Sequence, residues 1–154
     1  MPTVTEQLQR IVADYRAAGE AWPATAEEMA EWAVSHDRYQ LTRGMAVTQC
    51  REHIARAMRL EHVRDNKGRS VRRYYAARLR RDGKQMTLWA DWDADRSFME
   101  VAVANRRNQI LGECRQLKTD LDSYNDRHAL EIPIQASFDF TVDLEELGQL
   151  DDAG

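Results

Sequence analysis

Basic side chains are concentrated in one stretch of the chain, residues 43–84. This stretch holds 13 Lys and Arg residues against 4 Asp and Glu residues, whereas the whole chain has a formal net charge of −4. The residues before and after it are therefore acidic. Guanidinium and ammonium groups at this density repel one another, and a phosphate backbone would relieve that repulsion. The charge distribution indicates a polyanionic partner for residues 43–84.

A helix over residues 45–59 would place a mixed polar face opposite an apolar one. The apolar side chains that we expect this helix to bury are Val47, Cys50, Ile54, Ala57 and Met58. The opposite face carries Thr48, Gln49, Glu52, Arg56 and Arg59. Arg and Gln can each make two hydrogen bonds to the edge of guanine or adenine, so this face could read bases in duplex DNA. An ordinary solvated helix face is the alternative.

A two-stranded ribbon is expected next, with strands at residues 60–65 and 70–77. Residues 66–68, Asn-Lys-Gly, tolerate the positive φ angles that a short hairpin loop requires. The basic residues of the tip and second strand are Lys67, Arg69, Arg72 and Arg73. We expect these side chains to contact the phosphate backbone.

The order of helix, helix, helix and basic hairpin resembles the winged helix-turn-helix family of DNA-binding domains. The first two helices are expected to begin at capping boxes, formed by Thr3 with Glu6 and by Thr25 with Glu28. The resemblance covers about residues 3–80 and rests on element order, length and charge. It implies that the major groove would be faced by Thr48, Gln49, Glu52 and Arg56. It further implies that the flanking phosphates or minor groove would be held by Lys67, Arg69, Arg72 and Arg73, with Arg43 as a phosphate contact just ahead of the third helix.

Residues 85–89, Gln-Met-Thr-Leu-Trp, resemble the short peptide with which many bacterial replication and repair proteins bind a sliding clamp. The resemblance implies that the clamp would be contacted by Gln85, Met86, Leu88 and Trp89. A strand or apolar seam that covers the hairpin explains the same residues. We therefore expect residues 85–96 to be either a linker or a strand.

A long helix is expected at residues 97–124. Its apolar positions recur every seven residues, at Val103, Ile110, Leu117 and Tyr124. Cys114 and Leu121 fill the second position of the same seam. We expect this helix to pair two copies of the chain into a homodimer, and a helix that folds back on its own chain is the alternative.

The residues after this helix alternate between apolar and polar side chains. The apolar members are Ile132, Ile134, Ala136, Phe138, Phe140 and Val142. This alternation predicts a strand with one buried face, which must pair with another segment because a lone strand is unstable. The acidic residues from Asp143 onward are expected to form a mobile tail.

These segments together predict an α+β, mostly helical fold. Its parts are a winged helix-turn-helix domain at residues 1–84, a linker or strand at 85–96, a dimerisation helix at 97–124, and a C-terminal strand with an acidic tail at 125–154.

The chain lacks the residue patterns of common catalytic and metal sites. Its 7 glycines are scattered, and its 4 histidines and 2 cysteines have no metal-ligand spacing. We therefore expect no enzymatic activity, no cofactor and no metal. No apolar run approaches the ~18 residues of a membrane span, no secretory signal is recognisable, and both cysteines are expected to be buried free thiols, so we expect a cytoplasmic protein.

Two functions fit these features. The first is a binder of duplex DNA, such as a small transcriptional regulator or a factor for replication or plasmid maintenance. The alternative is a protein-interaction adaptor that uses residues 85–89 and 132–142, with the winged domain as a scaffold.

Overall fold

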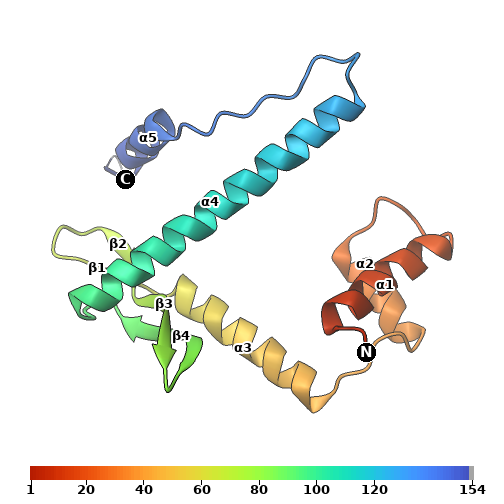
Figure 1. Ribbon diagram of the computed structural model, residues 1–154, viewed down its shortest axis with the longest axis horizontal. Helices are drawn as coiled ribbons and strands as arrows, with labels where there is room; N and C mark the ends of the chain where they lie inside the picture. The colour runs from red at the N-terminus through yellow and green to blue at the C-terminus, as the bar shows by residue number, and fades with distance from the viewer. Residues whose placement is uncertain (153–154) are drawn as a thin grey trace. The chain divides into compact units, whose positions relative to one another are not determined.

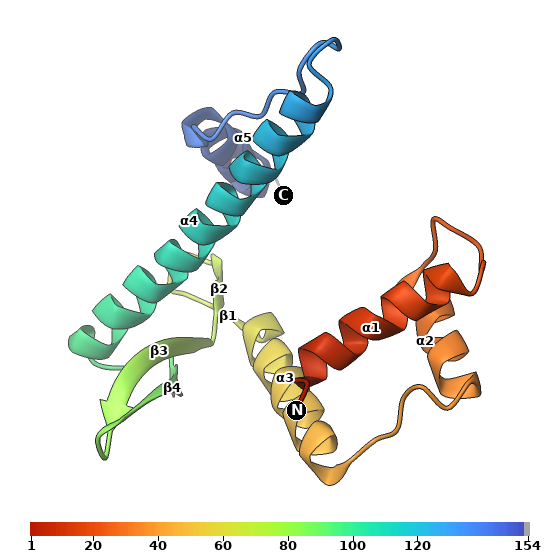
Figure 2. The same ribbon diagram turned by 45° about the vertical axis from the view of Figure 1, so that its right-hand side comes forward.

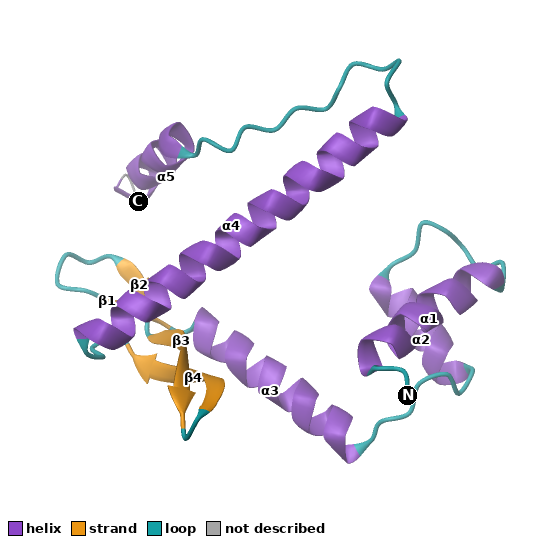
Figure 3. Ribbon diagram, in the orientation of Figure 1, coloured by secondary structure: helices purple, strands orange, loops and turns teal. Residues whose placement is uncertain are grey.

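The computed structural model describes residues 1–152 and shows helices and strands in the order of Figure 1. Three helices come first: α1 (Val4–Ala17), α2 (Ala26–Ser35) and α3 (Arg43–Leu60). Four strands follow: β1 (His62–Arg64), β2 (Ser70–Arg72), β3 (Tyr74–Arg81) and β4 (Lys84–Asp91). The last elements are α4 (Arg96–Arg127) and α5 (Thr141–Asp152). The protein is thus α+β and mostly helical (Figure 3). It divides into two units between residues 57 and 58.

In the first unit, α1 and α2 begin at the two predicted capping boxes. The Thr3 hydroxyl accepts a hydrogen bond from Glu6 N at 3.1 Å, and the Glu6 carboxylate accepts one from Thr3 N at 2.6 Å. The same pair of bonds joins Thr25 and Glu28. The two helices pack on each other (Figure 2), with Tyr15 buried between them. Both capping boxes are therefore confirmed.

Helix α3 begins at Arg43, two residues before the predicted start. The Thr42 hydroxyl accepts a hydrogen bond from Met45 N at 3.2 Å, which satisfies one of the free N–H groups of the first turn. Arg43 is therefore the first residue of the helix and does not precede it.

The apolar face of α3 is exposed, so the prediction that this helix buries it is wrong. Val47 is 62% exposed and Ile54 is 54% exposed. Cys50 is an exposed free thiol, which also contradicts its predicted burial. Tyr15 of α1 and Ala33 of α2 are buried, whereas none of the residues of α3 is buried.

The second unit contains two hairpins, in contrast to the single ribbon that the sequence predicts. Strands β1 and β2 pair antiparallel with His62 opposite Arg72, and β3 and β4 pair antiparallel from Tyr74 opposite Asp91 down to Arg81 opposite Lys84. The predicted strand over residues 70–77 is interrupted at Arg73, which lies outside both β2 and β3, although its N donates to Glu61 O at 2.9 Å in the register of the β1–β2 pair. Strand β3 then takes β4 as its partner.

The turn between β3 and β4 consists of two residues, Asp82 and Gly83. Both have positive φ angles, 51° and 77°. Two successive positive φ angles are what a two-residue hairpin turn of type I′ requires, and Asp-Gly is a preferred sequence for it. This turn makes residues 84–91 a strand, which is one of the two alternatives predicted for this stretch.

Helix α4 lies against β3 in both views of the chain (Figures 1 and 2). Ala77 of β3 and Ala102 of α4 are 1% and 3% exposed, and their small side chains permit a close approach of the two elements. Asn105 Oδ1 accepts a hydrogen bond from Arg78 N at 2.8 Å, so the helix also satisfies the edge of β3. The Asp95 carboxylate caps the helix by accepting from Phe98 N at 2.8 Å.

The predicted C-terminal strand at residues 132–142 is wrong. Residues 132–140 lie outside any helix or strand, and α5 occupies most of the predicted acidic tail. Strands β3 and β4 already pair with each other, so the alternating segment has no strand partner within residues 1–152. The backbone of Ile134 is hydrogen-bonded to the Asn125 side chain, which donates to Ile134 O at 2.9 Å and accepts from Ile134 N at 3.0 Å.

Helix α5 begins where a carboxylate can satisfy free backbone N–H groups. Asp139 Oδ1 accepts from Thr141 N at 3.1 Å and from the Thr141 hydroxyl at 2.7 Å. These bonds lower the pKa of the Asp139 carboxyl. Across residues 1–152, none of the helices combines the length and the apolar composition that crossing a membrane demands.

Candidate functional site

A pocket of about 160 Å³ lies in the second unit, where α4 crosses the β3–β4 hairpin. Three arginines line it: Arg59 from the last turn of α3, Arg72 from the end of β2, and Arg106 from α4. The rest of the lining includes Tyr75 and Trp89. Among residues 1–152, no Asp or Glu lines the pocket. The fold therefore brings together three cations that come from three separate elements.

The electrostatics of this pocket are those of like charges held close together. Burial lowers the pKa of the Arg72 guanidinium, and the positive charges of Arg106 and Arg59 lower it further. Arg59 also lies over the Trp89 ring, with its Cζ 5.7 Å from the ring centroid. None of the three arginines forms an ion pair with any residue from 1 to 152. Such an arrangement favours an anion in the pocket.

Sequence reasoning identifies Arg59 and Arg72 as candidate contacts but misses Arg106. The available signal is the Arg106-Arg107 pair, which stands in an otherwise acidic part of the chain. The position of Arg106 relative to β2 cannot be deduced from the sequence, because no sequence pattern indicates where α4 crosses the hairpin.

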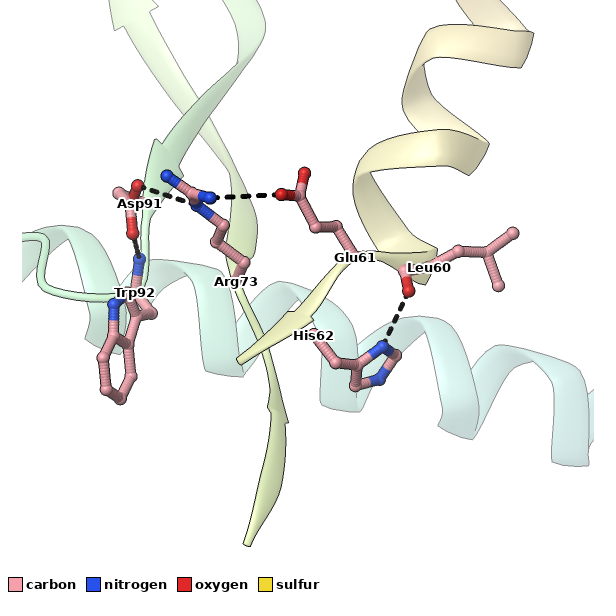
Figure 4. Close-up of polar contacts among 6 residues, drawn as sticks. All are labelled: Leu60, Glu61, His62, Arg73, Asp91 and Trp92. Atoms are coloured by element: carbon pink, nitrogen blue, oxygen red, sulfur yellow. Dashed lines mark hydrogen bonds and ion pairs between the residues drawn. The ribbon is translucent and has the colours of Figure 1, made fainter. Parts of the chain in front are cut away.

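Arg73 lies next to Arg72 in sequence but makes different contacts. Its Nη1 lies 3.1 Å from Glu61 Oε1 and its Nε lies 3.4 Å from Asp91 Oδ2 (Figure 4). The pKa of Arg73 is raised, first by the neighbouring Tyr74 and then by Asp91 and Glu61. The guanidinium thus joins the start of β1 to the end of β4, and its charge is already compensated within the protein.

The tip of the β1–β2 hairpin is organised by Asp65. Asp65 Oδ1 accepts from Lys67 N at 3.0 Å and from Arg69 N at 2.9 Å, while Oδ2 lies 2.7 Å from Arg69 Nε. These contacts, with the Arg69 backbone bond foremost, lower the pKa of the Asp65 carboxyl. Within residues 1–152 neither Lys67 nor Arg64 has an acidic partner at this tip, and Arg64 Nη1 donates instead to Gly68 O at 2.8 Å.

The other predicted DNA contacts lie on α3 in the first unit. These residues are Arg43, Thr48, Gln49, Glu52 and Arg56, and all of them are exposed. Gln49 also borders a largely apolar groove of about 420 Å³ that includes Leu8, Val12 and Val34 of α1 and α2. The helix therefore presents the predicted polar face to solvent.

The clamp-like peptide is built into the second hairpin. In β4, Leu88 lies opposite Ala77 and Trp89 lies opposite Ala76. Met86, Leu88 and Trp89 are half-buried, and Gln85 is exposed. The apolar residues of this peptide thus contribute to packing inside the second unit.

The seam of α4 is largely uncovered. Val103, Ile110 and Leu117 are each about half exposed, at 58%, 54% and 49%. Cys114 and Leu121 of the same seam are half-buried. Residues 1–152 contain no group of three or more His, Cys, Asp or Glu side chains placed to hold a metal ion.

Comparison with known proteins adds no relative. No protein-family model, curated protein or solved structure matches this chain.

Proposed function

We propose that this protein binds duplex DNA through residues 43–84 and the neighbouring part of α4. The observation that carries the proposal is the amount of uncompensated positive charge. Of the 13 basic residues in this stretch, only Arg69 and Arg73 form ion pairs with residues inside the described range. Charges of this kind gain little from folding and gain much from phosphates, because binding releases the counterions of the DNA.

In the proposed mechanism, α3 reads base edges while the hairpin and the arginine pocket contact the backbone. Gln49 and Arg56 are exposed on one helix and have the hydrogen-bonding groups that recognise adenine and guanine. Lys67 extends from the hairpin tip as a phosphate contact. The order of three helices and a basic hairpin supports placing residues 1–84 among winged helix-turn-helix domains.

The same proposal assigns α4 to the pairing of two copies. Val103, Ile110 and Leu117 repeat every seven residues and are about half exposed in a single chain. A second α4 would cover this seam and remove apolar surface from water. A dimer of this kind would set the spacing between two half-sites on the DNA.

Binding to a random-sequence duplex at about 50 and 200 mM salt tests the proposal. The logarithm of the binding constant should fall with the logarithm of salt concentration by about 0.9 for each phosphate contacted. Affinity that does not change with salt would reject an electrostatic DNA interface. Gln49→Ala or Arg56→Ala should instead relax the preference at one base pair by about 1–3 kcal/mol, without a large change in binding to random duplex.

A protein-interaction adaptor is the second candidate, and the segment before α5 supports it. Residues 132–140 have no strand partner within the described chain, and Ile132 is 95% exposed. An extended apolar segment can add itself to the sheet edge of another protein. Capture of a protein partner that is lost on Ile132→Asp, in a protein that retains no duplex, would favour this function. A sliding clamp remains a proposed partner, to be tested with Trp89→Ala.

A further inference from the structure

We infer that the pocket formed by Arg59, Arg72 and Arg106 is a specific phosphate-binding site. The inference rests on the proposed function in one respect, since a phosphate of the DNA backbone is one source of the ligand. A phosphate group of a free nucleotide is the other source. The chemistry that recognises the two is the same.

The first reason is the geometry of the cations. Guanidinium groups are planar donors that match phosphate oxygens, and three arginines from three elements line one pocket. The pocket of about 160 Å³ has room for a tetrahedral anion and some water. No acid of the described chain occupies the position that the anion would take.

The second reason is the neutral donors beside the arginines. Asn105 uses its Oδ1 to accept from Arg78 N at 2.8 Å, which fixes the amide and leaves Nδ2 as the free donor. Asn105, Thr87 and Gln109 all line the pocket. Neutral donors of this kind hold phosphate oxygens without adding to the repulsion among the cations.

The third reason is the aromatic wall. Trp89 lines the pocket and carries Arg59 over its ring, and Tyr75 lines it as well. An aromatic face next to a phosphate site provides a surface on which a base can stack. This property suits a nucleotide better than it suits an inorganic anion.

The decisive experiment compares Arg106→Gln with Arg115→Gln in the full-length protein. Both substitutions remove one positive charge from α4, but Arg115 lies outside the pocket and outside the apolar seam. Three probes are titrated by calorimetry or anisotropy: pyrophosphate, a nucleoside monophosphate and a random-sequence duplex. The urea denaturation midpoint of each variant verifies that both remain folded.

Arg106→Gln should weaken at least one probe by about tenfold or more, the loss expected for one charge-assisted contact, while Arg115→Gln binds as wild type does. If Arg106→Gln loses affinity for the two small probes, a free nucleotide is the source of the phosphate. If it loses affinity for the duplex alone, the DNA backbone is the source. If Arg106→Gln and Arg115→Gln bind all three probes equally well, the inference is overturned. Salt-dependent duplex binding in that case, with all three probes bound equally well by both variants, would reject this pocket but keep the proposed function. Binding of the small probes without binding of the duplex would keep this pocket and reject the proposed function.

Discussion

Arg72 and Arg73 are adjacent in sequence, yet their substitution should have opposite effects. Arg72 faces the arginine pocket, where it has only like charges around it within residues 1–152. Arg73 bridges Glu61 at 3.1 Å and Asp91 at 3.4 Å. Arg72→Gln should therefore reduce DNA binding without a loss of stability. Arg73→Gln should reduce stability without a loss of DNA binding.

The expected magnitudes come from these contacts. Removal of one phosphate contact lowers the salt slope by about 0.9, so the change in affinity between about 50 and 200 mM salt becomes smaller by a factor of about 3.5. The Arg73 side chain is 41% exposed, so solvent screens its two ion pairs. Their loss should lower the free energy of unfolding, by the small amount that exposed and screened ion pairs contribute. Arg72→Gln should leave this free energy unchanged or raise it slightly, because it relieves the repulsion from Arg59 and Arg106.

Two assays separate the outcomes. Fluorescence anisotropy of a labelled duplex at several salt concentrations gives the slope, and urea denaturation gives the free energy of unfolding. The reasoning is refuted if Arg73→Gln flattens the salt dependence as much as Arg72→Gln does. It is also refuted if Arg72→Gln is the more destabilising of the two.

Four further predictions concern the elements that support the site. Asp95→Ala should lower the free energy of unfolding by about 1 kcal/mol through loss of the α4 cap, whereas Asp95→Asn should lose much less; urea denaturation measures both. Ala102→Leu should cost about 1–3 kcal/mol in the same assay, because the larger side chain cannot fit against β3. Leu117→Asp should convert a dimer into a monomer in a mass measurement in solution, and an unchanged mass would contradict pairing through α4. The pKa of the Asp65 carboxyl is lowered from its ordinary value of 3.8. The ionised carboxylate should therefore stabilise the β1–β2 hairpin above pH 3.8, and this stabilisation should be lost as the pH falls through the lower pKa of the folded protein. An acid titration that follows the amide chemical shifts of the hairpin tip measures this loss.

Local signals in the sequence predict the starts of α1 and α2 well, whereas α5 is not predicted. The two capping boxes specify the starts of α1 and α2 because each satisfies free N–H groups within four residues of chain. The Asp82-Gly83 turn is also a local signal, and it indicates the second hairpin directly. The prediction that residues 85–96 are a linker or a strand does not use this turn, and so it does not identify the pairing of β3 with β4.

The features that the sequence does not predict depend on partners distant along the chain. The alternation of residues 132–142 is a genuine strand pattern, but a strand also needs a neighbour, and the pattern does not supply one. The apolar face of α3 has helical spacing, but spacing alone does not determine what covers it. The arginine pocket depends on where α4 crosses β3, and no sequence pattern indicates that the stretch around Ala102 packs against β3.

Helix α4 continues far beyond Ala102 and Asn105, the residues through which it contacts β3, and its last residue is Arg127. At 1.5 Å per residue, the part after Asn105 is about 33 Å long. Insertions or deletions after Gln109, the last residue of α4 that lines the pocket, would leave the pocket intact and change only the reach and the rotational phase of the distal helix. Removal of seven residues would shorten the helix by about 10 Å and rotate the remainder by only about 20°, whereas removal of two would turn it by about 160°. The length of α4 is therefore free to vary in steps of seven residues, and a chain altered in this way would keep its seam on the same side.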